Sequence, residues 1–125
     1  MHETIKVSSL GKTWLLDIDG TICKHNGYKI DGADTLLDGA KEFFSSLSPD
    51  DRVILLTSRG HELAEMTESF LRENGVPFDA VIYDLPYGER ILINDRKPSG
   101  LITSIAVNTD RDVFCEVAFE TDSSL

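Results

Sequence analysis

Apolar residues along this chain occur either in short runs or at helical spacing. Short runs of this kind are typical of buried strands, and they cover residues 14–16, 52–56, 80–83, 90–95 and 102–107. Two longer segments, 36–47 and 63–71, repeat apolar residues at the spacing of one helix face. Because the first strands alternate with helices over short links, we expect an α/β fold with a parallel sheet and helices on both of its faces.

Local signals add smaller features to this layout. Residues 4–7 are interpreted as a loose start or a short edge strand, and residues 113–119 as an edge strand. Asn26-Gly27 is typical of a hairpin turn, because both turn positions require positive φ, and it predicts a small β-hairpin flap after the first strand. Asp34 is expected to cap the first helix, and Gly75 to end the second.

Polar side chains follow three of the expected strands at the point where each strand ends. They are Asp17 and Asp19 after the first strand, Thr57 after the second, and Asp95 after the fourth. Because ligands of open α/β sheets bind at the carboxyl ends of the strands, we expect these side chains to meet in one crevice. Structural interpretations stay open beside this one, with the acids as turn residues, Thr57 or Ser58 as a helix cap, and Arg59 in a surface ion pair.

The residue types at this crevice suit the binding of a phosphate group. Two carboxylates separated by a single residue favour a hard cation such as Mg2+, or a nucleophile beside a general acid. The N-terminus of the second helix would present free N–H groups to the same place, which favours an anion. The flap would carry Lys24, His25 and Tyr28, which are either exposed flap residues or contacts to a substrate.

Composition narrows the expected function. The chain has 125 residues, which fits one domain over residues 1–125, and a net charge of −10 from 12 basic and 22 acidic residues. This balance argues against a nucleic-acid or anionic-membrane surface, although a small local basic site remains compatible with it. With no apolar run of membrane-span length, no signal-peptide pattern, and Cys23 and Cys115 expected as ordinary thiols, we expect a cytoplasmic protein.

Three motifs, in this order, resemble those of the haloacid-dehalogenase superfamily of phosphohydrolases. Residues 17–21 (DIDGT) match its first motif, and residues 55–59 (LLTSR) match its second, an apolar strand ending in Thr or Ser. Residues 93–95 (IND) resemble the fourth motif, with Asn94 in place of one acid. The resemblance runs from about residue 12 to residue 107. It implies a three-layer, Rossmann-like fold without a cap domain.

The resemblance implies a Mg2+-dependent phosphatase that acts through an aspartyl-phosphate intermediate. Asp17 would be the nucleophile and Asp19 the general acid and base, and both would hold Mg2+ together with Asp95. Thr57 would bond the phosphoryl oxygens, whose negative charge grows in the transition state. The residues expected to contact the substrate are Gly20, Thr21, His25, Ser58 and Arg59.

One departure from the family pattern concerns the Lys that precedes its fourth motif. No Lys lies between Thr57 and Asp95 in this sequence. Lys97, just past the expected strand end, is the candidate substitute, whereas Arg90 begins that strand and would lie at its wrong end. The missing acid at Asn94 would also leave the metal site less negative, so we expect weaker Mg2+ binding.

The open site that the resemblance implies bears on substrate and partners. Such a site admits a large substrate or is covered by another subunit, so a homo-oligomer is compatible with it. The acidic surface favours a small phosphate ester such as a sugar phosphate, with no nucleic acid and no membrane as partner. Two alternatives stay open: a non-catalytic binding or regulatory protein of the same fold, favoured by Asn94 and the missing Lys, and a receiver domain with acids at its strand ends.

Overall fold

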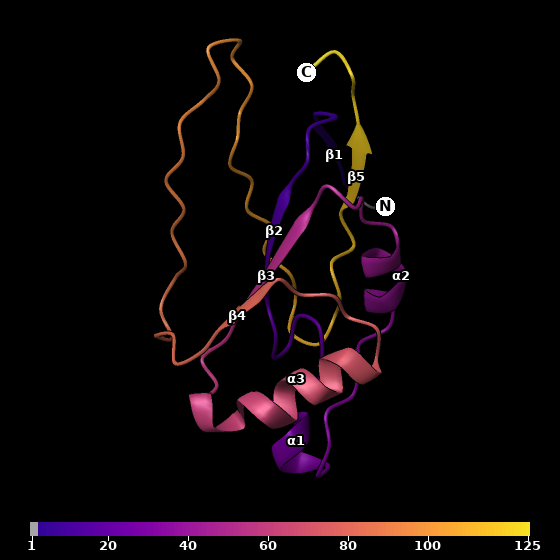
Figure 1. The fold of residues 1–125 in the computed structure, drawn as a ribbon, viewed down its shortest axis with the longest axis vertical. Coiled ribbons are helices and arrows are strands. Elements are labelled where there is room, and N and C mark those ends of the chain that lie inside the picture. The colour runs from indigo at the N-terminus through magenta and orange to yellow at the C-terminus, as the bar shows by residue number, and fades with distance from the viewer. Residues whose placement is uncertain (1–2) are drawn as a thin grey trace.

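A computed structural model of the chain describes residues 3–125 (Figure 1). The strands of this part are β1 (Thr4–Val7), β2 (Thr13–Asp17), β3 (Arg52–Leu56), β4 (Ala80–Ile82) and β5 (Ala118–Thr121). The helices are α1 (Gly27–Ile30), α2 (Ala40–Ser45) and α3 (Ala64–Glu73), with a 3-10 turn, η1 (His61–Leu63), leading into α3. Strands and helices therefore alternate from β2 to β4, as the hydrophobic pattern predicts.

The central sheet joins β2, β3 and β4 in that order, and both of its strand pairs are parallel. Thr13 lies opposite Arg52 and Asp17 opposite Leu56, so β2 and β3 end level with each other. Parallel neighbours require a crossover, which the segments containing α2 and α3 provide. The prediction of a small α/β fold with parallel strands is confirmed at this level.

A second, two-stranded sheet pairs segments that are far apart in the sequence. β1 and β5 run parallel, with Thr4 opposite Ala118 and Val7 opposite Thr121. Strands near both expected edge segments are confirmed, although β5 begins later than residue 113. Trp14 links the two sheets, because its ring centroid lies 5.0 Å from that of Phe119.

The core lies around β3 and the turn that follows β2. Ile18, Ile22, Leu55 and Leu71 are each 0% exposed. Burial of side chains of this size contributes roughly 1.5–3 kcal/mol each. The carboxyl ends of β2 and β3 therefore rest on the most densely buried part of the described chain.

Helices α2 and α3 lie where the pattern predicts them, and α2 is shorter than expected. α2 begins after Gly39, whose φ of 91° breaks the helix, so the predicted cap at Asp34 is wrong. Gly75 ends α3 in the left-handed region with φ 71°, as predicted. In Figure 1, α3 lies below the central sheet, where β2 and β3 end. Within residues 3–125 we find no helix whose length and apolar character would carry it across a membrane.

The predicted hairpin flap is wrong. Asn26 has the positive φ of a turn residue, 54°, but Gly27 does not, and it begins the helix α1 instead. The type I′ turn that Asn-Gly favours requires positive φ at both positions, so this hairpin does not form. Cys23 instead forms isolated bridges with Asp19 and Leu36, which hold this segment against the end of β2.

Residues 85–108, which we call the arm, leave the body as two extended limbs joined by a turn (Figure 1). In that turn the N–H of Lys97 donates to the carbonyl of Leu101 at 3.0 Å. The strands predicted at 90–95 and 102–107 are wrong, because no ladder forms in either segment. An apolar, β-prone sequence favours an extended backbone, but a strand forms only where a neighbouring strand is available for pairing.

Candidate functional site

The carboxyl ends of β2 and β3 form the candidate site. A tight turn follows Asp17 and is organised by the carbonyl of Ile18. The N–H groups that this carbonyl accepts, at 2.9 to 3.3 Å, belong to Thr21, Ile22 and Cys23. Since the turn is built on a buried residue, it presents the flanking carboxylates of Asp17 and Asp19 from a rigid base.

Asp17 is more open than Asp19 and Asp34. Its side chain is 34% exposed, and that of its partner Arg90 is 35% exposed. Arg90 Nη1 donates to Asp17 Oδ1 at 2.9 Å, and the Thr21 hydroxyl donates to Oδ2 at 3.2 Å. An ion pair this exposed contributes up to about 1 kcal/mol, so another anion can compete for Arg90. The expected position of Arg90 is wrong, because the residue lies at the base of the arm and not at the start of a parallel strand.

Asp19 and Asp34 share one arginine, Arg59. Its Nε and Nη2 donate to the two oxygens of Asp19 at 2.9 and 2.8 Å. Its Nη1 and Nη2 donate to the two oxygens of Asp34 at 3.0 and 2.8 Å. The side chains of Arg59 and Asp34 are each 2% exposed. Paired bonds of this geometry are strong, and removing one partner would leave an uncompensated buried charge.

Further contacts fix Arg59 inside the body. Its Nη1 donates to the Thr67 hydroxyl at 2.9 Å, and its guanidinium carbon lies 4.4 Å from the centre of the Tyr28 ring. Burial alone would lower the pKa of Arg59, but the hydrogen bonds to Asp19 and Asp34 outweigh it and raise the pKa. Arg59 is therefore a charged internal residue that is held by two carboxylates, and it is neither part of a surface ion pair nor free to bind the anion of a substrate.

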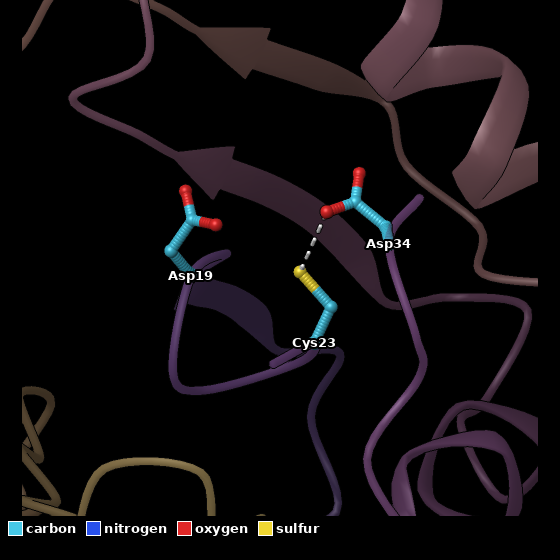
Figure 2. Close-up of side chains that lie close together, drawn as sticks. All are labelled: Asp19, Cys23 and Asp34. Atoms are coloured by element: carbon cyan, nitrogen blue, oxygen red, sulfur yellow. Dashed lines mark hydrogen bonds between the residues drawn. The ribbon is translucent and has the colours of Figure 1, made fainter. Parts of the chain in front are cut away.

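Cys23 lies between Asp19 and Asp34, as Figure 2 shows. One ligand atom from each of the three lies within 4.8 Å of the others, which would suit a metal ion. Burial, then the charges of Asp34 and Asp19, raise the pKa of the Cys23 thiol to about 12. A thiol that stays protonated at neutral pH is a poor metal ligand, and Arg59 already compensates both acids. We interpret this cluster as structural. Both cysteines are free, as predicted.

The hydroxyls that follow β3 serve its turn. Thr57 is 1% exposed, and its Oγ1 accepts the backbone N–H of Arg59 at 3.0 Å. The Ser58 hydroxyl donates to the carbonyl of Pro86 at 3.5 Å, at the start of the arm. Neither residue caps a helix, because Gly60 and Leu63 are the N-cap residues of η1 and α3 and neither helix has a side-chain cap bond. Thr57 still follows directly on the end of β3, level with the end of β2.

A loop from the last part of the chain covers the turn after β2. The N–H of Asp112 donates to the carbonyl of Gly20 at 2.8 Å, and Asp112 Oδ1 accepts the N–H of His25 at 2.6 Å. Gly20 has φ +82°, and a Cβ there would lie 3.3 Å from Cγ of Arg111. Glycine is therefore needed both for the backbone conformation and for this close approach. His25 and Arg111 border the site as a result.

Several residues of this site were not predicted as part of it. These residues are Asp34, Arg90, Arg111 and Asp112. They reach the site through contacts with segments far away in the sequence. The polar segment that contains Arg111 and Asp112 interrupts two β-prone stretches, but no periodicity shows which turn it covers. The nearest usable signal was Gly20, because a glycine after strand-end acids indicates that another segment comes close.

Asp95 and Lys97 are not brought to this site within one chain. Both belong to the arm, and Lys97 begins the turn that joins its limbs. Figure 1 shows the turn of the arm at the top, whereas β2 and β3 end toward the bottom. The carbonyl of Asp95 accepts the Thr103 hydroxyl of the opposite limb, and the Asn94 amide donates to Thr103 Oγ1 at 3.0 Å. Of the four residues predicted to converge, Asp17, Asp19 and Thr57 therefore do so and Asp95 does not. Gly20, Thr21 and Arg59 lie with the first three.

The acids of the site differ in how well they suit Mg2+. Asp17 keeps free lone pairs beside its bonds to Arg90 and Thr21, while both oxygens of Asp19 are held by Arg59. Mg2+ commonly uses one or two carboxylates, with water and phosphate oxygens completing its shell. The described residues fit that kind of site. They do not assemble the predicted site of Asp17, Asp19 and Asp95.

No family model and no curated protein matches this chain. A chain from a structure of the Pnkp1/Rnl/Hen1 complex is similar, with a TM-score of 0.52 and 25% identity over 68% of this chain and 32% of that chain. A chain from a structure of the Pnkp1/Rnl/Hen1 RNA repair complex matches with a TM-score of 0.51 and 26% identity, over 69% and 30% of the two chains. The present chain thus spans about a third of the length of either.

These neighbours contradict the resemblance to the haloacid-dehalogenase superfamily and the function it implied. The similar chains belong to an RNA repair complex, and no family model matches, so the predicted phosphatase acting on a sugar phosphate is contradicted. The predicted absence of a nucleic-acid partner is contradicted by the same neighbours. Two physical reasons apply: a strand-and-turn motif describes local geometry that many chemistries share, and net charge averages over local basic sites.

Proposed function

We propose that this chain is an RNA-repair domain that recognises the phosphate-bearing end of an RNA strand where β2 and β3 end. The proposal treats residues 1–125 as one domain. The observation that carries it is the ion pair of Asp17 and Arg90, about one third exposed at the sheet end where ligands bind. The similarity to chains of an RNA repair complex supports RNA as the source of the phosphate.

The cations around Asp17 suit a terminal phosphate. Arg90 offers a planar guanidinium that can make two parallel bonds to phosphate oxygens. Arg111 and His25 lie close to Gly20, in the turn that follows Asp17. Because the exposed pair with Asp17 is weak, a doubly charged phosphate offers Arg90 a better partner.

The net charge of −10 limits how RNA can bind. A long run of phosphates would be repelled by the acidic surface, since binding along a strand needs a basic stripe. A terminal phosphate needs only the local cations near Asp17. We therefore expect a shallow salt dependence, with a log–log slope of about −0.7 for each phosphate contacted.

Mg2+ belongs to this proposal, with Asp17 as the protein ligand. When bound, the ion would supply positive charge between that carboxylate and the phosphate, which otherwise repel each other. Arg90 would turn from Asp17 to the phosphate, while Thr21 would keep Asp17 oriented. Asp17→Asn should therefore remove the Mg2+ dependence of binding.

The test measures fluorescence anisotropy of short oligoribonucleotides with a phosphate at one end, at the other end, or at neither, with and without Mg2+. We expect one phosphorylated strand to bind at least about tenfold more tightly than the hydroxyl strand, because a charge-assisted bond contributes about 1.5–3 kcal/mol. Arg90→Ala should remove this preference. Arg72→Ala, on α3 with a side chain 65% exposed, should keep it.

Three results would contradict the proposal. They are equal affinity for all three strands, absence of binding by the folded protein, and a preference that survives Arg90→Ala. In each case the strand-end site would not be the place where a phosphate is recognised.

A further inference from the structure

We propose that the arm of one copy of this chain adds a strand to the free edge of β2 in a second copy, so that two copies form a reciprocal dimer. Residues 91–95 are the added strand. The proposal goes beyond RNA recognition and does not depend on it.

The arm is the first observation behind this proposal. Ile91 is 83% exposed, Ile93 91% and Ile102 62%, which is unusual for branched apolar residues in one segment. The limbs are tied to each other mainly near the turn, through Lys97 and Asn94. A ribbon of two strands is marginally stable in water by itself, so this arm needs a surface to pack on.

The edge of the central sheet is the second observation. The sheet order leaves β2 with β3 on one side and, among residues 3–125, no ladder partner on the other. Leu15, in the middle of β2, is 45% exposed. An open edge with unpaired N–H and carbonyl groups is a template for a strand from another chain.

The two segments match in register. Placing Asp95 beside Asp17 in a parallel pair puts Ile93 beside Leu15 and Ile91 beside Thr13. Side chains alternate along strands, so the two isoleucines fall on the face where Leu15 is exposed. One arrangement therefore covers Ile91 and Ile93 of the arm together with Leu15 of β2.

The distribution of charge favours a second copy of this chain as the partner that binds the free edge of β2. The arm carries Arg90, Arg96 and Lys97 but only Glu89 and Asp95, whereas the whole chain has 12 basic and 22 acidic residues. The arm is thus weakly positive and the rest of the chain strongly negative, so each attracts the other. Since every copy holds both surfaces, a two-fold dimer satisfies the contact twice.

The dimer would complete the strand-end site from outside. Asp95 of one copy arrives beside Asp17 of the other, with Asn94 next to it. This is the convergence that the strand-end pattern predicts within a single chain, achieved between two. A second carboxylate beside Asp17 would raise the affinity of the site for Mg2+.

The first experiment measures the molar mass of the protein in solution by sedimentation equilibrium. We expect a dimer for the wild type and a monomer for the double variant Ile91→Asp, Ile93→Asp. Ile30→Asp is the matched control, because Ile30 is 68% exposed on α1 and should leave the dimer intact. A wild-type monomer at all concentrations, or a double variant that stays dimeric with an unchanged circular dichroism spectrum, would overturn the proposal.

A second experiment tests the edge and the register. Chains carrying Leu15→Cys are mixed with chains carrying Ile93→Cys, both in a Cys115→Ser background, and then oxidised. We expect a disulfide between the two kinds of chain, visible as a crosslinked band that reductant removes. A dimer that gives no such crosslink, while Leu15→Cys still reacts with a thiol reagent, would show that another surface joins the copies.

Discussion

Residues 13–17 (TWLLD) and 91–95 (ILIND) share a pattern, an apolar run closed by an aspartate, but they adopt different structures. The first is β2, paired with β3 along its whole length. The second lies in the arm, where Ile93 is 91% exposed. The two segments differ because β2 has a neighbouring strand, β3, to pair with, whereas no strand among the described residues of the same chain pairs with the arm. An apolar run therefore predicts extension, and its pairing depends on the rest of the molecule.

The largest expected effect separates the buried ion pairs of the body from the exposed pair at the base of the arm. Arg59→Ala leaves Asp34, 2% exposed, without its cation and should lower the free energy of unfolding by about 3–5 kcal/mol. Arg90→Ala removes the exposed partner of Asp17 and should cost less than about 1 kcal/mol. Urea unfolding of both variants measures the contrast. Similar losses for the two would show that burial does not distinguish these pairs.

The next effect compares the two apolar runs directly. Leu16→Ala in β2 removes a side chain that packs against the core and should cost about 2 kcal/mol. Ile93→Ala in the arm should cost less than about 0.5 kcal/mol at protein concentrations where the chain is monomeric. Thermal or urea unfolding at low concentration provides the values. A large loss for Ile93→Ala in the monomer would mean that the arm packs on its own body.

The smallest effect concerns Cys23 in the body. Burial raises the pKa of its thiol from 9.0 to about 12, so the folded state disfavours the thiolate. The resulting stability is complete below pH 9 and is lost as the pH rises toward 12. Between neutral pH and about pH 10 the wild type should therefore lose about 1 kcal/mol more than Cys23→Ala. Equal losses in urea unfolding would indicate that Cys23 is accessible to water.

The fold was predictable where short links join neighbouring strands. β2, β3 and β4 follow from apolar runs and crossovers, and Gly75 marks the end of α3 because only a left-handed residue fits there. The arm was not predictable from the same signals, since its pattern is that of a strand. The flap failed for a local reason, because Gly27 enters a helix with negative φ.

The candidate site was predictable in its location but not in the contacts of its side chains. The rule that strand ends carry ligand-binding residues brings Asp17, Asp19 and Thr57 together correctly. It does not show which partner each side chain selects: Arg59 turns inward to Asp34, and Arg90 reaches Asp17 from the arm. Such choices depend on the packing of segments that lie far apart in sequence, and no local pattern records them.

The parallel pairing of β1 with β5 has a consequence for folding during synthesis on the ribosome. The strands of the central sheet have all been synthesised once residue 82 is made, so that sheet can form early. β1 is made before any of them, yet its partner begins only at Ala118. Closing so long a loop is slow, because its entropy cost precedes any contact that rewards it. β1 must therefore wait as an unpaired nascent segment until translation reaches β5.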